Sequence, residues 1–221
     1  MIEAVLFDMD GIMFDTEALS IRMLRKAAEK FGCEKILEVV PRMMGSNAKT
    51  VRKICVEHMG DDFPYDTFMR YRQGLVDRSI AENGVPVKPG LRELLGYLDR
   101  EGYRKAVATS TSRAHAMEYL AKADVLDFFD AVICGDMLEK SKPDPEIYQK
   151  AAAAVGAAPE NCMALEDSPN GVASASAAGA RTVMVPDLIP FGPEQEKQVY
   201  ACVPALADVI PLLAGLRREN G

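Results

Sequence analysis

The amino-acid sequence predicts an α/β fold, a doubly wound (Rossmann-like) parallel sheet that carries an inserted all-helical domain. Five short apolar runs alternate with helix-length segments along the chain. This alternation is typical of a parallel sheet with helices on both faces, whose strands are apolar on both sides. The second observation is a long stretch of helical patterns between the first run and the other four. The strands are expected at Ala4–Phe7, Lys105–Ala108, Ala131–Cys134, Cys162–Leu165 and Thr182–Val185.

Residues 16–83 are expected to form the inserted helical domain. Apolar residues recur from Leu19 to Phe31 at the spacing of one helix face, and further helical patterns follow without a convincing strand. The α/β core then consists of residues 1–15 and 84–221.

Capping residues mark where two helices of the core begin. Asp144 followed by Pro145 predicts an N-cap and the first helical residue. Ser168 followed by Pro169 repeats the arrangement. Both pairs come shortly after predicted strands, so the sequence indicates compact strand–loop–helix units.

The composition argues against several classes of function. The formal net charge of −7 speaks against a broad nucleic-acid surface. The five cysteines are scattered and form no C-x-x-C pair, which favours reduced thiols over disulfides or a zinc site. No apolar run reaches membrane-spanning length, and the first residues lack the basic region of a signal peptide. We therefore expect a cytoplasmic protein without membrane or nucleic-acid partners. The oligomeric state is open, and a monomer is compatible with the sequence.

Polar residues follow four of the predicted strands. Ligands bind beyond the carboxyl ends of the strands in sheets of this type, so these residues are candidates for one shared site. Taken singly, each motif is also explained by a turn, a helix cap or a solvated lysine. Capping does not require all four together, which favours the joint interpretation. In chain order they are Asp8 and Asp10, Thr109 and Ser110, Lys142, and Glu166 and Asp167.

This set of side chains is suited to moving a phosphoryl group onto a carboxylate. A phosphate dianion repels an attacking carboxylate by about 1 kcal/mol in water, and by much more in a dry site. Mg²⁺ held by Asp8 and Asp167, together with the charge of Lys142, would offset this repulsion. Asp10 would then give the leaving alkoxide a proton, which is worth about 10²–10⁴ in rate. We expect Mg²⁺-dependent hydrolysis of a small phosphorylated metabolite through an aspartyl phosphate.

These four motifs, in this order, resemble those of the haloacid dehalogenase superfamily, in particular its phosphatases with a helical cap inserted after the first motif. The resemblance covers nearly the whole chain. It implies that Asp8 is the nucleophile, that Asp10 is the general acid and base, and that the Asp10 carbonyl is a metal ligand. It also implies that Thr109 binds phosphate, or Ser110 if the strand ends one residue later, and that Lys142 orients nucleophile and phosphate.

The same resemblance implies that Asp167 holds Mg²⁺, with Glu166 as a further candidate ligand of the ion. It also implies that the cap sets the choice of substrate. Candidate cap contacts are Thr16, Ser20 and Lys49, although solvent exposure is the preferred explanation for any one of them taken singly.

Relatives on the same scaffold supply the alternatives. The dehalogenases lack the acid two residues after the nucleophile, so Asp10 speaks against that activity. Phosphonatases use a cap lysine, and nothing in this sequence singles one out. Beta-phosphoglucomutases, the runner-up, carry a histidine where this chain has Ser20 and a cap arginine near Ala48 and Lys49. A third interpretation is a non-catalytic protein that binds a phosphorylated metabolite, which would not need an acid at Asp10.

Overall fold

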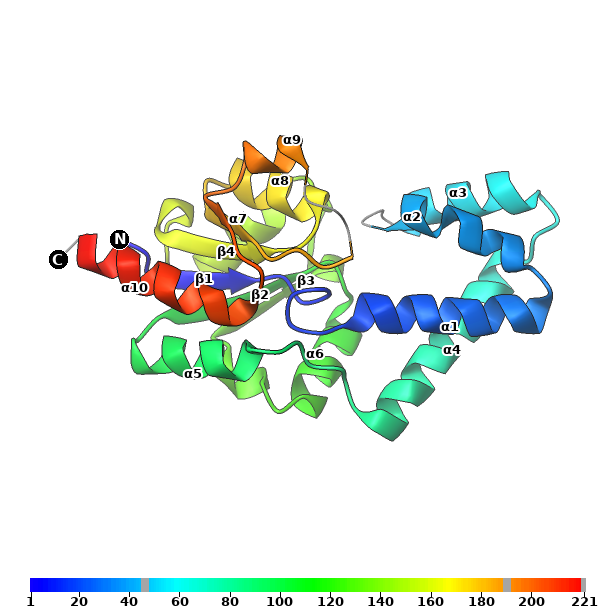
Figure 1. Cartoon of the computed structure of the whole chain (residues 1–221), viewed down its shortest axis with the longest axis horizontal. Helices are drawn as coiled ribbons and strands as arrows, with labels where there is room; N and C mark the ends of the chain where they lie inside the picture. The colour runs from blue at the N-terminus through cyan, green and yellow to red at the C-terminus, as the bar shows by residue number, and fades with distance from the viewer. Residues whose placement is uncertain (45–47, 189–191, 220–221) are drawn as a thin grey trace. The chain divides into compact units, whose positions relative to one another are not determined.

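The computed structural model describes residues 1–44, 48–188 and 192–219. Contacts divide the chain into two compact units (Figure 1). The core unit comprises Met1–Asp15 and Val87–Gly221, and the helical unit comprises Thr16–Pro86. Within the described ranges, no helix combines the length and the hydropathy needed to cross a membrane.

The core unit is built on a parallel sheet of six strands, in the order β3-β2-β1-β4-β5-β6. The predicted fold class is confirmed, and each of the five predicted runs forms a strand. The sixth strand was not predicted, because two residues at a sheet edge leave no apolar run to recognise. The strands are β1 (Ala4–Phe7), β2 (Arg104–Thr109), β3 (Ala131–Cys134), β4 (Cys162–Glu166), β5 (Arg181–Met184) and β6 (Ala201–Cys202).

Helices cover both faces of this sheet (Figure 1). One face carries α7 (Glu146–Ala154) and α8 (Pro169–Ala177), and the other carries α5 (Leu91–Arg100), α6 (Arg113–Lys122) and α10 (Val209–Glu219). Leu6 packs among the residues under α7 and α8, whereas Phe7 contacts the ring of Phe129 edge-on at 5.5 Å. Successive side chains of β1 thus enter two different cores, which explains why the strand is apolar throughout.

The two predicted capping pairs have different outcomes. Ser168 is the N-cap of α8, and its hydroxyl accepts the backbone N–H of Gly171 at 3.1 Å, as predicted. The start of α7 was predicted one residue too early, since its N-cap is Pro145 and not Asp144. Asp144 nevertheless stabilises this end, because its Oδ1 accepts the N–H of Glu146 at 3.1 Å.

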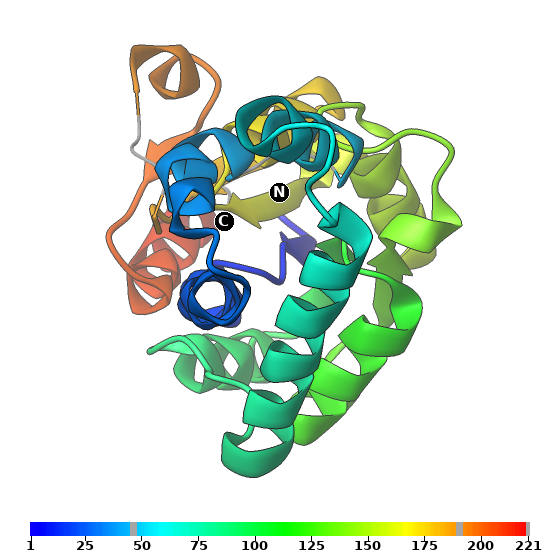
Figure 2. The same ribbon diagram turned by 90° about the vertical axis from the view of Figure 1, so that its right-hand side faces the viewer.

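The helical unit has its own apolar core. Its helices α1 and α4 pack against each other (Figure 2), and buried residues such as Leu24, Ile36 and Phe68 fill the space between its elements. Phe31 meets Phe68 edge-on, with ring centroids 5.5 Å apart. The α-helices described in this unit are α1 (Thr16–Phe31), α2 (Val40–Met43), α3 (Ala48–Met59) and α4 (Tyr65–Asn83).

Candidate active site

The central strand of the sheet delivers the first acid. Asp8 directly follows β1, and its backbone N–H donates to the carbonyl of Leu165 on β4 at 3.0 Å. The turn that follows requires glycine. Gly11 has φ +85°, and a Cβ there would lie 2.1 Å from Oδ2 of Asp167. Glycine therefore lets the turn after β1 approach the acid that follows β4.

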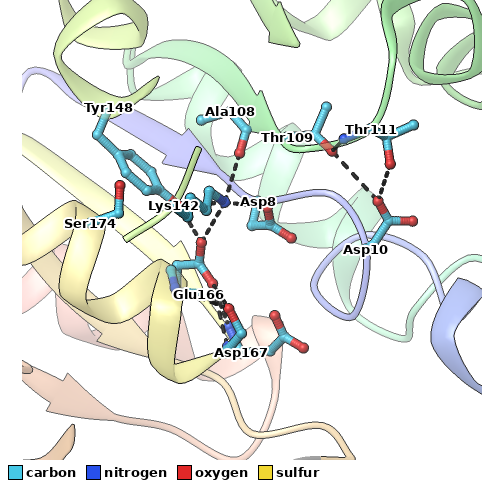
Figure 3. Close-up of polar contacts among 12 residues, drawn as sticks. Asp8, Asp10, Ala108, Thr109, Thr111, Lys142, Tyr148, Glu166, Asp167 and Ser174 are labelled. Atoms are coloured by element: carbon cyan, nitrogen blue, oxygen red, sulfur yellow. Dashed lines mark hydrogen bonds and ion pairs between the residues drawn. The ribbon is translucent and has the colours of Figure 1, made fainter. Parts of the chain in front are cut away.

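Lys142, in the segment between β3 and α7, joins three strands of the site (Figure 3). Its Nζ donates to Asp8 Oδ1 at 2.5 Å, to Glu166 Oε1 at 2.6 Å and to the carbonyl of Ala108 at 3.0 Å. An ammonium has three protons, so these contacts use its full capacity and fix its position. Burial lowers the pKa of Lys142, but Asp8 and Glu166 outweigh it and raise that pKa above its ordinary value. The lysine is therefore charged.

Glu166 is the fully buried partner that holds the lysine. Its Oε1 accepts the hydroxyl of Tyr148 at 2.6 Å in addition to Lys142. Its Oε2 accepts the backbone N–H of Asp167 at 3.2 Å, and the N–H and hydroxyl of Ser168 at 3.3 and 3.2 Å. A carboxylate oxygen has two lone pairs, so protein donors already occupy this carboxylate. Glu166 thus links the lysine to the start of α8.

Three buried carboxylates converge at this edge of the sheet. Oxygens of Asp8, Glu166 and Asp167 all lie within 4.8 Å of one another. Burial raises the pKa of Asp8 to about 8, with Lys142 opposing the shift and Glu166 and Asp10 adding to it. One lysine does not balance three acids, and clustered hard oxygen donors suit Mg²⁺. The residues present therefore fit a divalent cation.

Asp10 faces the loop after β2 (Figure 3). Its Oδ2 accepts the hydroxyl of Thr111 at 2.7 Å, and the hydroxyl of Thr109 lies 3.5 Å from the same atom. Thr109 is buried and is the last residue of β2, whereas Ser110 is exposed. The strand does not end one residue later, so the condition under which Ser110 was the expected phosphate ligand is not met.

Two residues at the site were not predicted, namely Thr111 and Tyr148. Thr111 lies two residues beyond Thr109, a spacing that puts side chains of extended backbone on the same side. That spacing was the available signal. For Tyr148 the sequence offers none, because an aromatic residue on the apolar face of a helix is expected to be core.

The candidate cap residues all lie in the helical unit, in different surroundings. Thr16 is buried at the start of α1, and Lys49 is exposed on α3. Ser20 is half-buried and accepts a hydrogen bond from the guanidinium of Arg72. Their part in substrate binding stays a prediction.

A doubly wound parallel sheet with a buried lysine and clustered carboxylates beyond its central strands is the arrangement expected of an α/β enzyme. Residues 5–185 match the model of the haloacid dehalogenase-like hydrolases, and the chain belongs to this family. The family indicated by the motifs and the expectation of a hydrolase are both confirmed.

Individual relatives cover most of the chain. The phosphorylated carbohydrates phosphatase of Thermotoga maritima is 33% identical over 181 residues, which span 82% of this chain and 83% of the relative. Hexitol phosphatase B of Escherichia coli K12 is 33% identical over 191 residues, which span 83% of each protein. The crystal structure of CbbY from Rhodobacter sphaeroides in complex with phosphate has a TM-score of 0.78 and 27% identity, and the match covers 95% of this chain and 96% of that chain.

Proposed function

We propose that this protein is a Mg²⁺-dependent phosphatase of small phosphorylated metabolites, with Asp8 as the nucleophile. The observation that carries the proposal is the contact of 2.5 Å between Lys142 Nζ and Asp8 Oδ1 within a buried carboxylate cluster. A carboxylate held in place by a fixed cation is suited to attack a phosphate, because the cation reduces the repulsion between two anions.

The metal would be held by Asp8 and Asp167, together with the backbone carbonyl of Asp10. When bound, Mg²⁺ supplies positive charge that neutralises the phosphate oxygens. We propose that Glu166 does not bind the metal directly. Its oxygens already accept hydrogen bonds from Lys142, Tyr148 and the start of α8. Glu166 would then act by holding Lys142 against the nucleophile.

The reaction would run in two half-reactions. In the first, an oxygen of Asp8 bonds to phosphorus while the ester P–O bond breaks, and protonated Asp10 gives its proton to the leaving oxygen. In the second, water bonds to phosphorus and gives a proton to Asp10, and the bond between phosphorus and the Asp8 oxygen breaks. The products are an alcohol and inorganic phosphate, and both acids return to their starting states. Thr109 at the end of β2 would bind the transferred phosphoryl group.

We further propose that the helical unit is the cap that selects the substrate. A cap of this kind closes to exclude water during the attack and opens to release the product. Thr16, Ser20 and Lys49 are the candidate contacts. Relatives named for phosphorylated carbohydrates and for hexitols support sugar or polyol phosphates as the substrate class.

The test is phosphate release from a panel of phosphorylated sugars and polyols with Mg²⁺, with Asp8→Asn as the control. We expect release by the native protein and a loss of at least about 10³-fold in the variant, because the nucleophile is gone. Turnover by Asp8→Asn at the native rate would rule out the mechanism. Interconversion of hexose phosphate isomers without release would instead identify a mutase, and binding without either reaction would identify a non-catalytic binding protein.

A further inference from the structure

The loop after β2 brings a second threonine to the site. The Thr111 hydroxyl donates to Asp10 Oδ2 at 2.7 Å, a distance typical of a strong O–H···O hydrogen bond (Figure 3). The Thr109 hydroxyl lies much farther from that oxygen, at 3.5 Å. Of the two hydrogen bonds to Asp10 drawn for this loop in Figure 3, the short one therefore comes from Thr111.

The backbone of Thr111 is tied down at both ends. Its N–H donates to the hydroxyl of Thr109 at 3.0 Å, and its carbonyl accepts the N–H of Gly135 at 3.0 Å. Gly135 follows β3, and a Cβ there would lie 2.2 Å from the carbonyl oxygen of Ser110. Glycine thus allows the end of β3 to pack against this loop. The Thr111 hydroxyl is consequently presented by a rigid support and not by a free loop.

We propose that Thr111 is the positioning residue for Asp10. Its hydroxyl holds Oδ2 and so fixes the orientation of the carboxyl group that exchanges a proton with the leaving group and with water. The inference rests on the proposed function, because the acid–base role of Asp10 is part of it. Misplacing a catalytic group by a small distance lowers the rate substantially, so the loss of this one contact should be measurable.

Two substrates with different leaving groups can show whether Thr111 positions the acid or only stabilises the structure. An alkoxide leaving a hexose 6-phosphate needs a proton, whereas the p-nitrophenolate of p-nitrophenyl phosphate departs without one. The constant kcat/KM reports the steps up to transfer to Asp8. We expect Thr111→Val to lower kcat/KM for the hexose phosphate by about tenfold, and for p-nitrophenyl phosphate by less than about twofold. Thr111→Ser, which keeps the hydroxyl, should restore both values.

Ser112→Ala is the matched control. It removes a hydroxyl from the same loop, and that hydroxyl contacts His115 Nδ1 at 3.2 Å. Its ratio of the two kcat/KM values should equal that of the native protein. Thermal unfolding of every variant checks that the fold is retained. Equal losses on both substrates in Thr111→Val, or failure of Thr111→Ser to recover, would overturn the proposal.

A double variant tests whether Thr111 acts through Asp10. Adding Thr111→Val to Asp10→Asn should change the ratio of the two kcat/KM values no further, because the group being positioned is already absent. A further loss confined to the hexose phosphate would contradict the inference. If the native protein releases phosphate from neither substrate and from no member of the panel of phosphorylated sugars and polyols, the proposed function fails. If the native protein is active but Thr111→Val leaves the ratio of the two kcat/KM values unchanged, only the role assigned to Thr111 fails.

Discussion

At the scale of single residues, the site depends on how its buried charges are compensated. Glu166 is fully buried, and a buried carboxylate is tolerated only when hydrogen bonds and opposite charge replace its water. Lys142 and Tyr148 donate to one of its oxygens, and the start of α8 donates to the other. Tyr148 therefore stabilises the arrangement that holds the lysine against Asp8.

Removal of the Tyr148 hydroxyl should weaken this arrangement. Tyr148→Phe keeps the ring but deletes a charge-assisted hydrogen bond of 2.6 Å to Glu166. We expect the free energy of unfolding to fall by about 1–3 kcal/mol, measured by urea denaturation. Tyr103→Phe, the same change at a buried ring elsewhere in the core unit, is the control and should cost less. Equal costs for the two variants would contradict the role assigned to the Tyr148 hydroxyl.

At the scale of elements, the important features are the starts of helices that follow strands. Ser168 serves two purposes, since its hydroxyl accepts the N–H of Gly171 and also donates to Glu166 Oε2 at 3.2 Å. Ser112 stands at the N-cap of α6 without a side-chain cap hydrogen bond. Two serines at equivalent positions thus have unequal environments.

This inequality predicts different costs for the same substitution. Ser168→Ala should lower the free energy of unfolding by about 1–2 kcal/mol, because it removes both the cap and a donor to a buried carboxylate. Ser112→Ala should cost less than about 0.5 kcal/mol. Chemical denaturation of the two variants in parallel measures the difference. Comparable losses would show that the hydroxyl of Ser168 does not stabilise α8.

The same elements show what could be predicted from sequence. The strands were recognisable because their residues are buried on both faces. The location of the candidate site could then be predicted, because parallel strands present their carboxyl ends at one edge of the sheet. What escaped were features set by tertiary contacts. The edge strand β6 is defined by its pairing with β5. The hydroxyl of Tyr148 has a role at the site only because the fold places it against Glu166. The start of α7 was wrong by one residue because Asp144 caps that helix from outside its N-cap position.

At the scale of the whole molecule, the charge of the site links metal binding, pH and stability. Burial raises the pKa of Asp8 to about 8, far above its ordinary value of 3.8. The folded, metal-free protein therefore binds a proton more tightly than the unfolded chain does. Between about pH 4 and pH 8 this group makes the folded state less stable as pH rises. Mg²⁺ binds the ionised carboxylate, so it offsets the loss of folding stability that grows between about pH 4 and pH 8.

Stabilisation by Mg²⁺ should consequently increase with pH. We expect the Mg²⁺-induced rise in Tm to be small at pH 5.5, to grow through pH 7.5 and to level off above about pH 8, where Asp8 is already ionised. Titration calorimetry should show an apparent affinity that rises by up to about tenfold per pH unit below that point, with proton release on binding. Asp8→Asn offers the metal a neutral oxygen and removes the titrating group, so its residual Mg²⁺ affinity should vary much less with pH. A native protein whose Mg²⁺ affinity is the same at pH 5.5 and pH 7.5 would show that Asp8 does not exchange a proton for the metal.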